Sequence, residues 1–315
     1  MIISVASGKG GTGKTTIAIN LALSLSGTDA GSIQILDCDV EEPNAHIFLK
    51  PHITQDKSIS VPVPKIIEEK CNYCGKCQEV CAYNAIAVLL KSDQDISSTN
   101  ENRLSKAGKV LIFPELCHSC GGCSLLCPEK AIEEVNREIG RVQIGKVINI
   151  DFVNGKLNIG EAMSPPLIKA VKKNILKNKL TIIDAPPGTS CPVIESIKGS
   201  DYCILVTEQT PFGLNDLILA VEVIRELGIP CGVIINRTDV QTDSGRVVFQ
   251  EIDDYCVKEN IPVLMKIPFD KKIAQSYSKG IPIVDIIPDY KNAFQQLFQK
   301  IKIDQLKKHS KKEAN

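Results

Sequence analysis

The sequence predicts an α/β protein with a doubly wound, mostly parallel sheet that is interrupted by a small inserted α+β domain. Short runs rich in β-branched residues alternate with helical patterns over most of the 315 residues. That order of elements produces a parallel sheet with helices on both faces. The alternation stops between about residues 58 and 150, where eight of the 13 cysteines are clustered. The interruption therefore predicts a second, smaller domain.

The individual elements follow from apolar periodicity. Buried strands are expected at residues 2–6, 33–37, 180–184, 202–206, 232–236 and 263–267. Helical patterns cover residues 14–25, 165–176, 214–227 and 246–259. The segment VPVPK at 61–65 is predicted to be a linker, because proline disfavours regular pairing. The predicted domains are thus a discontinuous one of residues 1–58 and 151–315 and an insert of residues 59–150.

Composition narrows the functional classes. Lys+Arg and Asp+Glu both number 37, so the net charge is zero and no general attraction to nucleic acid is expected. The start of the chain has no signal-peptide pattern, and no apolar run reaches the ~18 residues of a membrane span. A cytoplasmic location is predicted. In such a reducing compartment clustered cysteines hold metal more often than they form disulfides.

A phosphate-binding loop is predicted between the first strand and the first helix. Residues 8–15, GKGGTGKT, satisfy the pattern G-x-x-x-x-G-K-[ST]. Glycines let backbone N–H groups converge on phosphate oxygens, and the helix N-terminus adds its positive end. Lys14 is expected to contact the β- and γ-phosphates and Thr15 to bind Mg²⁺, so the predicted ligands are ATP or ADP with Mg²⁺. The residues assigned to nucleotide binding here are Gly8, Gly10, Gly11, Thr12, Gly13, Lys14, Thr15 and Thr16.

Lys9, early in this loop, makes the segment similar to the deviant Walker A motif of the MinD/Mrp/ParA class of P-loop ATPases. In that family the early lysine acts on the nucleotide of the other subunit of an ATP-dependent homodimer. The resemblance therefore implies a catalytic role for Lys9 beside Lys14. LDCDVEEPN at 36–44 resembles the family's switch I, which implies that Asp39 activates the attacking water.

Two further segments support this resemblance. IIDAPPGTS at 182–190 resembles the Walker B and switch II region, which implies that Asp184 holds Mg²⁺ through water and that Gly188 senses the γ-phosphate. An acidic residue that closes an apolar strand beside a phosphate loop is also what the positioning of magnesium requires. Asn236 and Arg237, which follow the run GVII, resemble the family's adenine-contacting pair.

The inserted region contains an internal repeat. CNYCGKCQEVCAYNAI at 71–86, the first copy, aligns with CHSCGGCSLLCPEKAI at 117–132, the second copy. Each copy contains C-x₂-C-x₂-C-x₃-C, the bacterial ferredoxin pattern, in which the fourth cysteine of each run binds the cluster of the other run. The first copy departs from the pattern at Ala82, where the second copy has Pro128.

Two 4Fe–4S clusters are therefore predicted. The first thiol set is Cys71, Cys74, Cys77 and Cys127, and the second thiol set is Cys117, Cys120, Cys123 and Cys81. Zinc is the alternative, but duplicated runs of cysteines spaced by two residues suit a cubane better than a tetrahedral ion. The polar segment 91–108 between the copies is expected to be an exposed hairpin tip, with a partner-binding loop as the alternative.

Two other features bear on partners. Cys191 follows Asp184 by seven residues, the offset at which the nitrogenase iron protein of the same class places a cluster cysteine. No second such cysteine is apparent, so a bridging cluster is the minority alternative. The C-terminal segment has an apolar helical face that is expected to pack on the sheet rather than on a membrane. That face consists of Phe294, Leu297, Phe298 and Ile301.

Together the two modules predict an ATP-hydrolysing iron–sulfur protein that couples nucleotide state to electron transfer toward an unidentified redox partner. Switch segments change shape when the γ-phosphate is lost, and fully ligated clusters pass electrons. One alternative is an iron–sulfur carrier that delivers clusters to client proteins, although the chain has no C-x-x-C outside the insert. The other alternative is a positioning or partition-type ATPase with redox-sensing clusters.

Overall fold

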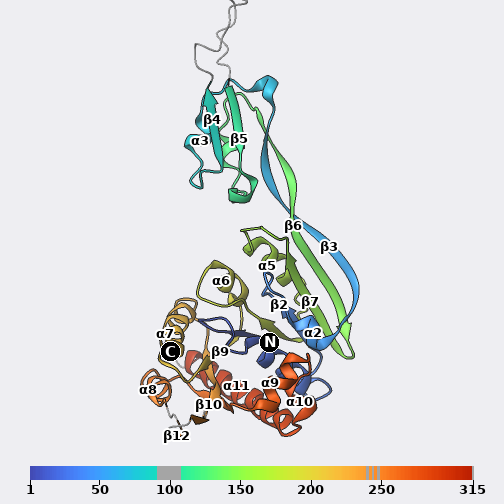
Figure 1. Ribbon diagram of the computed structural model, residues 1–315, viewed down its shortest axis with the longest axis vertical. Coiled ribbons are helices and arrows are strands. Elements are labelled where there is room, and N and C mark those ends of the chain that lie inside the picture. Colours follow the sequence, from blue (N-terminus) through green and yellow to red (C-terminus); the bar gives the residue numbers. More distant parts are fainter. Residues whose placement is uncertain (91–107, 239–240, 243–244, 247–248, 314–315) are drawn as a thin grey trace, which may run out of the picture. The chain divides into compact units, whose positions relative to one another are not determined.

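The computed structural model describes residues 1–90, 108–238, 241–242, 245–246 and 249–313 (Figure 1). The chain forms two compact units. Unit 1 comprises Met1–Lys57, Arg141–Leu157 and Leu167–Asn315, and unit 2 comprises Ser58–Gly140 and Asn158–Pro166. The sequence analysis placed residues 141–150 in the insert, but these residues belong to unit 1 because they form strands of its sheet.

Unit 1 is built on a nine-stranded sheet with the strand order β13-β10-β9-β1-β8-β2-β7-β6-β3. The strands are β1 (Ile2–Ala6), β2 (Ile33–Asp37), β3 (His52–Ile66), β6 (Ile132–Val147), β7 (Ile150–Leu157), β8 (Leu180–Asp184), β9 (Tyr202–Glu208), β10 (Cys231–Thr238) and β13 (Val263–Pro268). All pairs from β13 to β7 are parallel. The six strands expected from periodicity occupy six consecutive places in this order, which confirms the predicted α/β class. The short strands β11 (Gln241–Thr242) and β12 (Gly245–Arg246) pair only with each other.

Helices cover both faces of the sheet. They are α1 (Lys14–Leu25), α2 (Ala45–Leu49), α5 (Pro165–Lys172), α6 (Cys191–Ile197), α7 (Pro211–Glu226), α8 (Glu251–Lys258), α9 (Lys271–Ser278), α10 (Ile283–Ile286) and α11 (Asp289–Glu313). Successive side chains of a strand point to opposite faces. In β9, Ile204 packs in the core layer that contains α1 and α11, whereas Leu205 packs in the layer that contains α6, α7 and α8.

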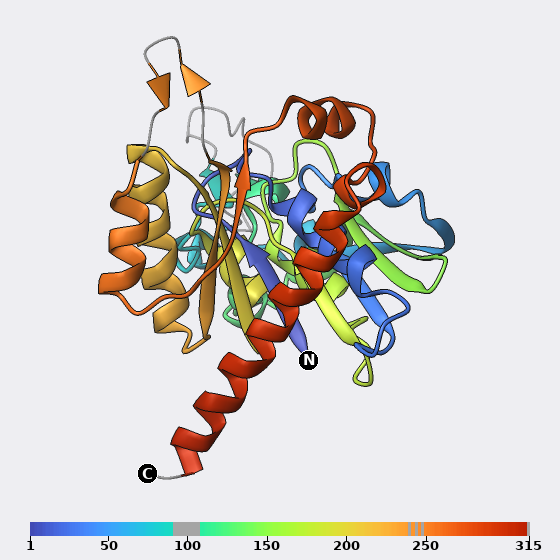
Figure 2. The same cartoon turned by 90° about the horizontal axis from the view of Figure 1, so that it is seen from below.

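The long C-terminal helix α11, red in Figure 2, lies alongside α1. The apolar residues Phe294, Leu297, Phe298 and Ile301 are all at most 2% exposed. In addition, the Gln295 side-chain amide donates a 2.9 Å hydrogen bond to the carbonyl oxygen of Ser24 in α1. The predicted packing of this face on the body of the protein is therefore confirmed. Among the described residues, no helix is both long and apolar enough to cross a membrane.

The prediction of a linker at residues 61–65 is wrong, because these residues lie within the 15-residue strand β3. Proline is tolerated in edge strands, where its missing N–H group removes no ladder hydrogen bond. β3 is the last strand in the sheet order, and Val61 and Val63 are buried while Pro62 is exposed. The segment therefore alternates like a strand, although its prolines resemble those of a linker.

Unit 2 repeats one set of elements at an offset of 46 residues. The 3₁₀ helix η1 (Glu68–Lys70), helix α3 (Lys76–Glu79) and strand β4 (Ile86–Leu90) correspond to η3 (Pro114–Leu116), α4 (Gly122–Leu125) and the start of β6. Left-handed backbone conformations recur at the same offset, in the pairs Tyr73 and Ser119, Gly75 and Gly121, and Asn84 and Lys130. The two copies of the cysteine motif thus share one backbone conformation.

The two halves of unit 2 also exchange reciprocal hydrogen bonds. The Ile67 N–H group donates to the carbonyl oxygen of Ala131 at 2.8 Å, and the Phe113 N–H group donates to that of Ala85 at 2.9 Å. Strand β4 pairs antiparallel with β5 (Gly108–Ile112). The hairpin tip or partner-binding loop expected at residues 91–108 falls almost entirely on residues 91–107, which lie outside the described residues.

The docking of α11 predicts a large effect of truncation in its buried face. We expect Phe294→Ala to lower the free energy of unfolding by about 3–5 kcal/mol, because the fully buried ring leaves a cavity in a packed layer. Ile303→Ala, in the same helix at a residue 51% exposed, is the matched control and should change stability by less than ~1 kcal/mol. Urea denaturation measures both. Equal effects of the two substitutions would contradict the packing of α11.

Candidate nucleotide and cluster sites

The phosphate-binding loop lies at the carboxyl edge of the parallel sheet. It connects β1 to α1, and β1 lies between β8 and β9. Asp37 ends β2, Asp184 ends β8, and Asn236 lies near the end of β10. Parallel strands bring their carboxyl ends to one edge, and open α/β sheets bind their ligands there. The topology therefore gathers residues that are far apart in the sequence around one loop.

The conformation of the loop depends on its glycines. Gly13 precedes α1 with a φ of 98°, in the left-handed region that glycine adopts without strain. A Cβ atom on Gly8 would lie 2.1 Å from the carbonyl oxygen of Asp216 in α7. The Asn236 side-chain amide donates a 2.8 Å hydrogen bond to the carbonyl oxygen of Thr12. The loop is thus held between α7 on one side and the end of β10 on the other.

A cavity of about 430 Å³ opens beside this loop. The cavity is bordered by many of the residues that the sequence analysis assigned to nucleotide binding or catalysis. These are Gly10, Gly11, Gly13, Lys14, Thr15, Thr16, Asp39, Asn236 and Arg237. Arg237 also forms a 2.6 Å ion pair with Glu208 at the end of β9. Gly188 lies next to the same loop, because its N–H group donates to the carbonyl oxygen of Ser7 at 3.0 Å. The structure therefore brings together the segments that were assigned separately.

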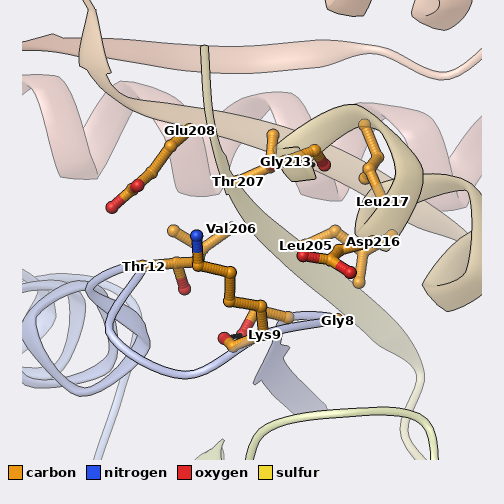
Figure 3. Close-up of a pocket in the computed structure, with 11 residues that line it drawn as sticks. Gly8, Lys9, Thr12, Leu205, Val206, Thr207, Glu208, Gly213, Asp216 and Leu217 are labelled. Carbon is orange, nitrogen blue, oxygen red and sulfur yellow. Dashed lines mark hydrogen bonds between the residues drawn. The ribbon is translucent and has the colours of Figure 1, made fainter. Parts of the chain in front are cut away.

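A second, much smaller cavity of about 10 Å³ lies between the loop and the start of α7 (Figure 3). Its border includes Gly8, Lys9, Thr12, Glu208, Gly213 and Asp216. Lys9 is absent from the border of the larger cavity, as far as the described residues define it. The two lysines of the loop are therefore separated, with Lys14 at the nucleotide cavity and Lys9 outside it.

Three charged groups lie close together at this site, two of them buried and the third, Asp39, partly exposed. Lys14 is 6% exposed, and burial lowers the pKa of its ammonium group, while Asp184 and Asp39 act in the opposite direction. Burial raises the pKa of Asp184 to about 7, and Lys14 partly offsets that effect. Burial likewise raises the pKa of Asp39 to about 6 against the influence of Lys14. A single buried cation thus faces two carboxylates.

The donor set around Asp184 fits a divalent cation. Both carboxylate oxygens of Asp184 are buried, the nearby Thr15 hydroxyl lowers the pKa of Asp184 through a side-chain hydrogen bond, and no other donor among the described residues satisfies either oxygen. Buried polar atoms in native proteins are normally satisfied, so a buried carboxylate with so few donors indicates an ion or water at that position. The buried hydroxyl oxygen of Thr12 lacks a hydrogen-bond partner. Asp184 and Thr15 are therefore the residues that would hold Mg²⁺, which would supply charge neutralisation for phosphate oxygens.

Asp37 is a functional residue that the sequence analysis missed. Its side chain is fully buried, and its two carboxylate oxygens accept hydrogen bonds from the N–H groups of Asp39 at 3.1 Å and Ala45 at 3.0 Å. Burial raises the pKa of Asp37, whereas the hydrogen bond from Ala45 lowers it. Asp37 thus fixes both ends of the segment that carries Asp39. The available signal was an aspartate at the end of a strand, two residues before Asp39.

Unit 2 contains a separate small pocket, with a cavity volume of about 20 Å³, at the first cysteine motif. All four members of the first thiol set, namely Cys71, Cys74, Cys77 and Cys127, border it. The fourth cysteine of each copy accepts a hydrogen bond from a backbone N–H group, Cys81 from Ala85 at 3.2 Å and Cys127 from Ala131 at 3.3 Å. Such N–H···S contacts stabilise negative charge on sulfur, so these donors fit a bound iron–sulfur cluster.

Other cysteines lie apart from these sets. Cys191 is exposed and begins α6, whereas Cys38, Cys203 and Cys256 are buried and Cys231 is partly exposed. Within the described part of the chain, no three His, Cys, Asp or Glu side chains are arranged to hold a single metal ion. The cysteines of the first set surround a cavity instead of converging on one point.

The fold and the loop place the chain in a known family. Residues 3–283 match the model of the CobQ/CobB/MinD/ParA nucleotide-binding domain, and the chain belongs to this family of P-loop ATPases. The resemblance drawn from the phosphate loop and the two switch segments is thereby confirmed at the level of the family.

Individual relatives agree with this assignment. The chain is 31% identical over 290 residues to an uncharacterized protein of Methanocaldococcus jannaschii, covering 89% of this chain and 90% of the relative. It is 26% identical over 335 residues to an iron-sulfur cluster carrier protein of Pyrococcus abyssi, covering 99% and 89%. Among solved structures, the septum site-determining protein MinD of Pyrococcus horikoshii, complexed with Mg-ADP, has a TM-score of 0.54 at 20% identity and 95% coverage of both chains. The last comparison supports the fold alone.

The close approach at Gly8 predicts that a methyl group is not tolerated there. We expect Gly8→Ala to destabilise the nucleotide-free protein by about 1–3 kcal/mol, because the added atom overlaps the backbone of α7. Gly10→Ala is the control in the same loop, since the nearest atom to its Cβ would be 3.9 Å away. Thermal unfolding without nucleotide distinguishes them. A Gly8→Ala protein as stable as Gly10→Ala would show that the loop does not contact α7 in this way.

Proposed function

We propose that this protein is a dimerising, iron–sulfur-binding ATPase in which the nucleotide state of unit 1 controls electron transfer through two 4Fe–4S clusters in unit 2. The observation that carries the proposal is the coexistence of two sites in one chain. One is a phosphate loop with a buried Lys14 and a buried Asp184, and the other is a small pocket bordered by four cysteines of a ferredoxin pattern.

For the nucleotide, this chain's residues account for binding and for the activation of water. Lys14 and the N–H groups before α1 bind phosphate oxygens, and Asp184 with Thr15 holds Mg²⁺. Asp39 borders the same cavity, and its raised pKa makes it a stronger proton acceptor than an ordinary aspartate. Asp37 holds the Asp39 segment in place through its two backbone hydrogen bonds. Asn236 and Arg237 are assigned to the adenine.

For the dimer, the position of Lys9 is the supporting observation. Lys9 is exposed and borders the small cavity instead of the nucleotide cavity of its own chain. A lysine that neutralises phosphate charge in trans must be accessible to a second subunit. The family resemblance assigns that role to the early lysine of the loop. We therefore assign Lys9 to the nucleotide of the partner in an ATP-dependent homodimer.

For the clusters, the two thiol sets supply the ligands and the loops supply N–H groups to the sulfurs. Bound clusters of this type carry single electrons. ATP-driven closure at Asp39 and Gly188 would alter solvent exposure and hydrogen bonding at the sulfurs, which are the factors that set a cluster's potential. An unidentified redox protein would be the partner.

A second candidate function is the delivery of clusters to client proteins. The supporting observation is the set of relatives named iron-sulfur cluster carrier protein, such as the one from Pyrococcus abyssi at 26% identity over nearly the whole chain. A carrier needs a labile site from which a cluster can leave. Cys191, exposed at the start of α6, is the cysteine of unit 1 that is open to such a role.

The two loop lysines should have separable effects. Lys14→Ala should weaken ATP binding at least tenfold, because it removes the buried cation that faces the phosphates. Lys9→Ala should bind ATP with nearly unchanged affinity and lose both hydrolysis and ATP-dependent dimerisation. Calorimetry, phosphate release and light scattering measure the three properties. A monomeric Lys9→Ala protein that hydrolyses ATP at the normal rate would refute the role in trans.

Coupling between the units predicts a potential that depends on nucleotide. Because linkage is reciprocal, a nucleotide that binds oxidised and reduced protein with different affinity must shift the reduction potential. A typical coupling of ~1–3 kcal/mol corresponds to a shift of tens of millivolts or more, given ~59 mV per tenfold ratio. EPR-monitored redox titrations without nucleotide, with ADP and with a non-hydrolysable ATP analogue test this. Three superimposable titrations, together with ATP-dependent loss of iron to an apo-ferredoxin, would favour the carrier.

A further inference from the structure

The internal repeat of unit 2 provides a comparison of two equivalent sites within one chain. Each thiol set takes three cysteines from one copy of the motif and its fourth cysteine from the other copy. Some contact between the copies must therefore hold each fourth cysteine beside its three partners. This inference rests on the proposed binding of clusters and concerns how the second thiol set is assembled.

Equivalent positions form a contact between the copies at each set, but with different chemistry. At the first set, the Asn72 side-chain amide donates a 2.9 Å hydrogen bond to a carboxylate oxygen of Glu129. At the second set, the rings of His118 and Tyr83 stack with centroids 3.4 Å apart and planes inclined by 4°. Positions 72 and 118 correspond in the repeat, as do positions 83 and 129. One contact is thus a polar bond and the other is an aromatic stack.

These contacts lie directly beside the fourth cysteines. Tyr83 is two residues after Cys81, and Glu129 is two residues after Cys127. Their partners are equally close to the other ligands of each set, since Asn72 follows Cys71 and His118 follows Cys117. Each contact therefore joins the loop of a fourth cysteine to the loop that carries the other three.

The turns that carry the fourth cysteines differ in rigidity. In the first copy the Asn84 N–H group donates to the carbonyl oxygen of Cys81 at 3.1 Å, and in the second the Lys130 N–H group donates to that of Cys127 at 3.2 Å. Both are four-residue turns, and proline at their second position fixes φ at about −65° in advance. The second copy has Pro128 there, whereas the first copy has Ala82. The Cys81 turn therefore lacks a constraint that the Cys127 turn has.

We propose that the Tyr83–His118 stack is the contact that holds Cys81 in the second thiol set, in place of the rigidity that Pro128 gives to Cys127. Tyr83 and His118 are then positioning residues, since neither carries a ligand sulfur. The first set has both a proline and a hydrogen bond, so it tolerates the loss of its contact between copies. Beyond the backbone hydrogen bond between the copies that each set has, the second set has the stack without a proline, so it does not.

The test compares substitutions at the two equivalent positions in the full chain. Wild-type protein purified without oxygen should contain about eight iron and eight sulfide per chain. In Tyr83→Ala, about half of the iron should pass to a ferrous chelator at least tenfold faster than in wild type. Glu129→Ala, the equivalent substitution at the first set, should release iron as wild type does. Tyr83→Phe keeps the ring and should also behave as wild type.

The identity of the weakened site is checked by EPR. After the fast phase, the reduced spectrum of Tyr83→Ala should match that of Cys120→Ala, which lacks a ligand of the second set, and differ from that of Cys74→Ala. His118→Ala removes the other ring of the stack and should show the same fast phase of iron release. It serves as the test variant if Tyr83→Ala expresses poorly. Adding Ala82→Pro to Tyr83→Ala should slow the release again, because it restores the constraint present at Pro128.

The possible failures are distinguishable. Wild-type protein without iron and sulfide, or with stoichiometric zinc, would overturn the proposed function itself. The wild-type protein could instead contain about eight iron while Tyr83→Ala and Glu129→Ala release iron at the same rate. That result would overturn only the role of the stack. If Ala82→Pro does not slow the release of iron from Tyr83→Ala, the stack does not replace the proline. The same conclusion follows if Tyr83→Phe releases iron as fast as Tyr83→Ala.

Discussion

The burial of charge at the carboxyl edge of the sheet is the constraint on which the nucleotide site depends. Lys14 and Asp184 are almost completely removed from water, and Asp39 is close enough to influence both groups. Isolated buried charges are strongly unfavourable unless they are paired or bind metal. One ammonium group cannot satisfy both carboxylates, and the Thr15 hydroxyl is the side-chain donor that acts on Asp184. A divalent cation, or a proton on Asp184, would relieve the excess negative charge of this arrangement.

The elements that carry this site could be predicted from sequence because their signals are local. The β-branched runs at residues 2–6 and 180–184 give buried strands, and the glycines between the first strand and helix give the loop. Parallel pairing then follows from the alternation of strands and helices. The contact of Gly8 with α7 and the hydrogen bond from Asn236 could not be predicted, because both depend on residues about 200 positions away.

The errors at residues 61–65 and 141–150 have different physical causes. A proline-containing segment is unsuited to a central strand but acceptable at a sheet edge, so its conformation depends on which strands lie beside it. β3 and β6 occupy the last two places of the sheet order, and each extends from unit 1 into unit 2. The boundary therefore falls within continuous strands, where composition gives no signal. Asp37 was missed for a similar reason, since its hydrogen bonds to Asp39 and Ala45 are visible only in the folded segment.

Lys172 connects α5 with the switch II region. Helix α6 directly follows the switch II segment, and the Lys172 ammonium group donates hydrogen bonds to the carbonyl oxygens of Glu195 and Lys198 at its C-terminal end, at 2.6 and 2.7 Å. A cation at this position also interacts favourably with the helix dipole. Lys172 is the last residue of α5, and the first two residues of α5 belong to unit 2. These hydrogen bonds join the helix that follows switch II to the end of α5 within unit 1.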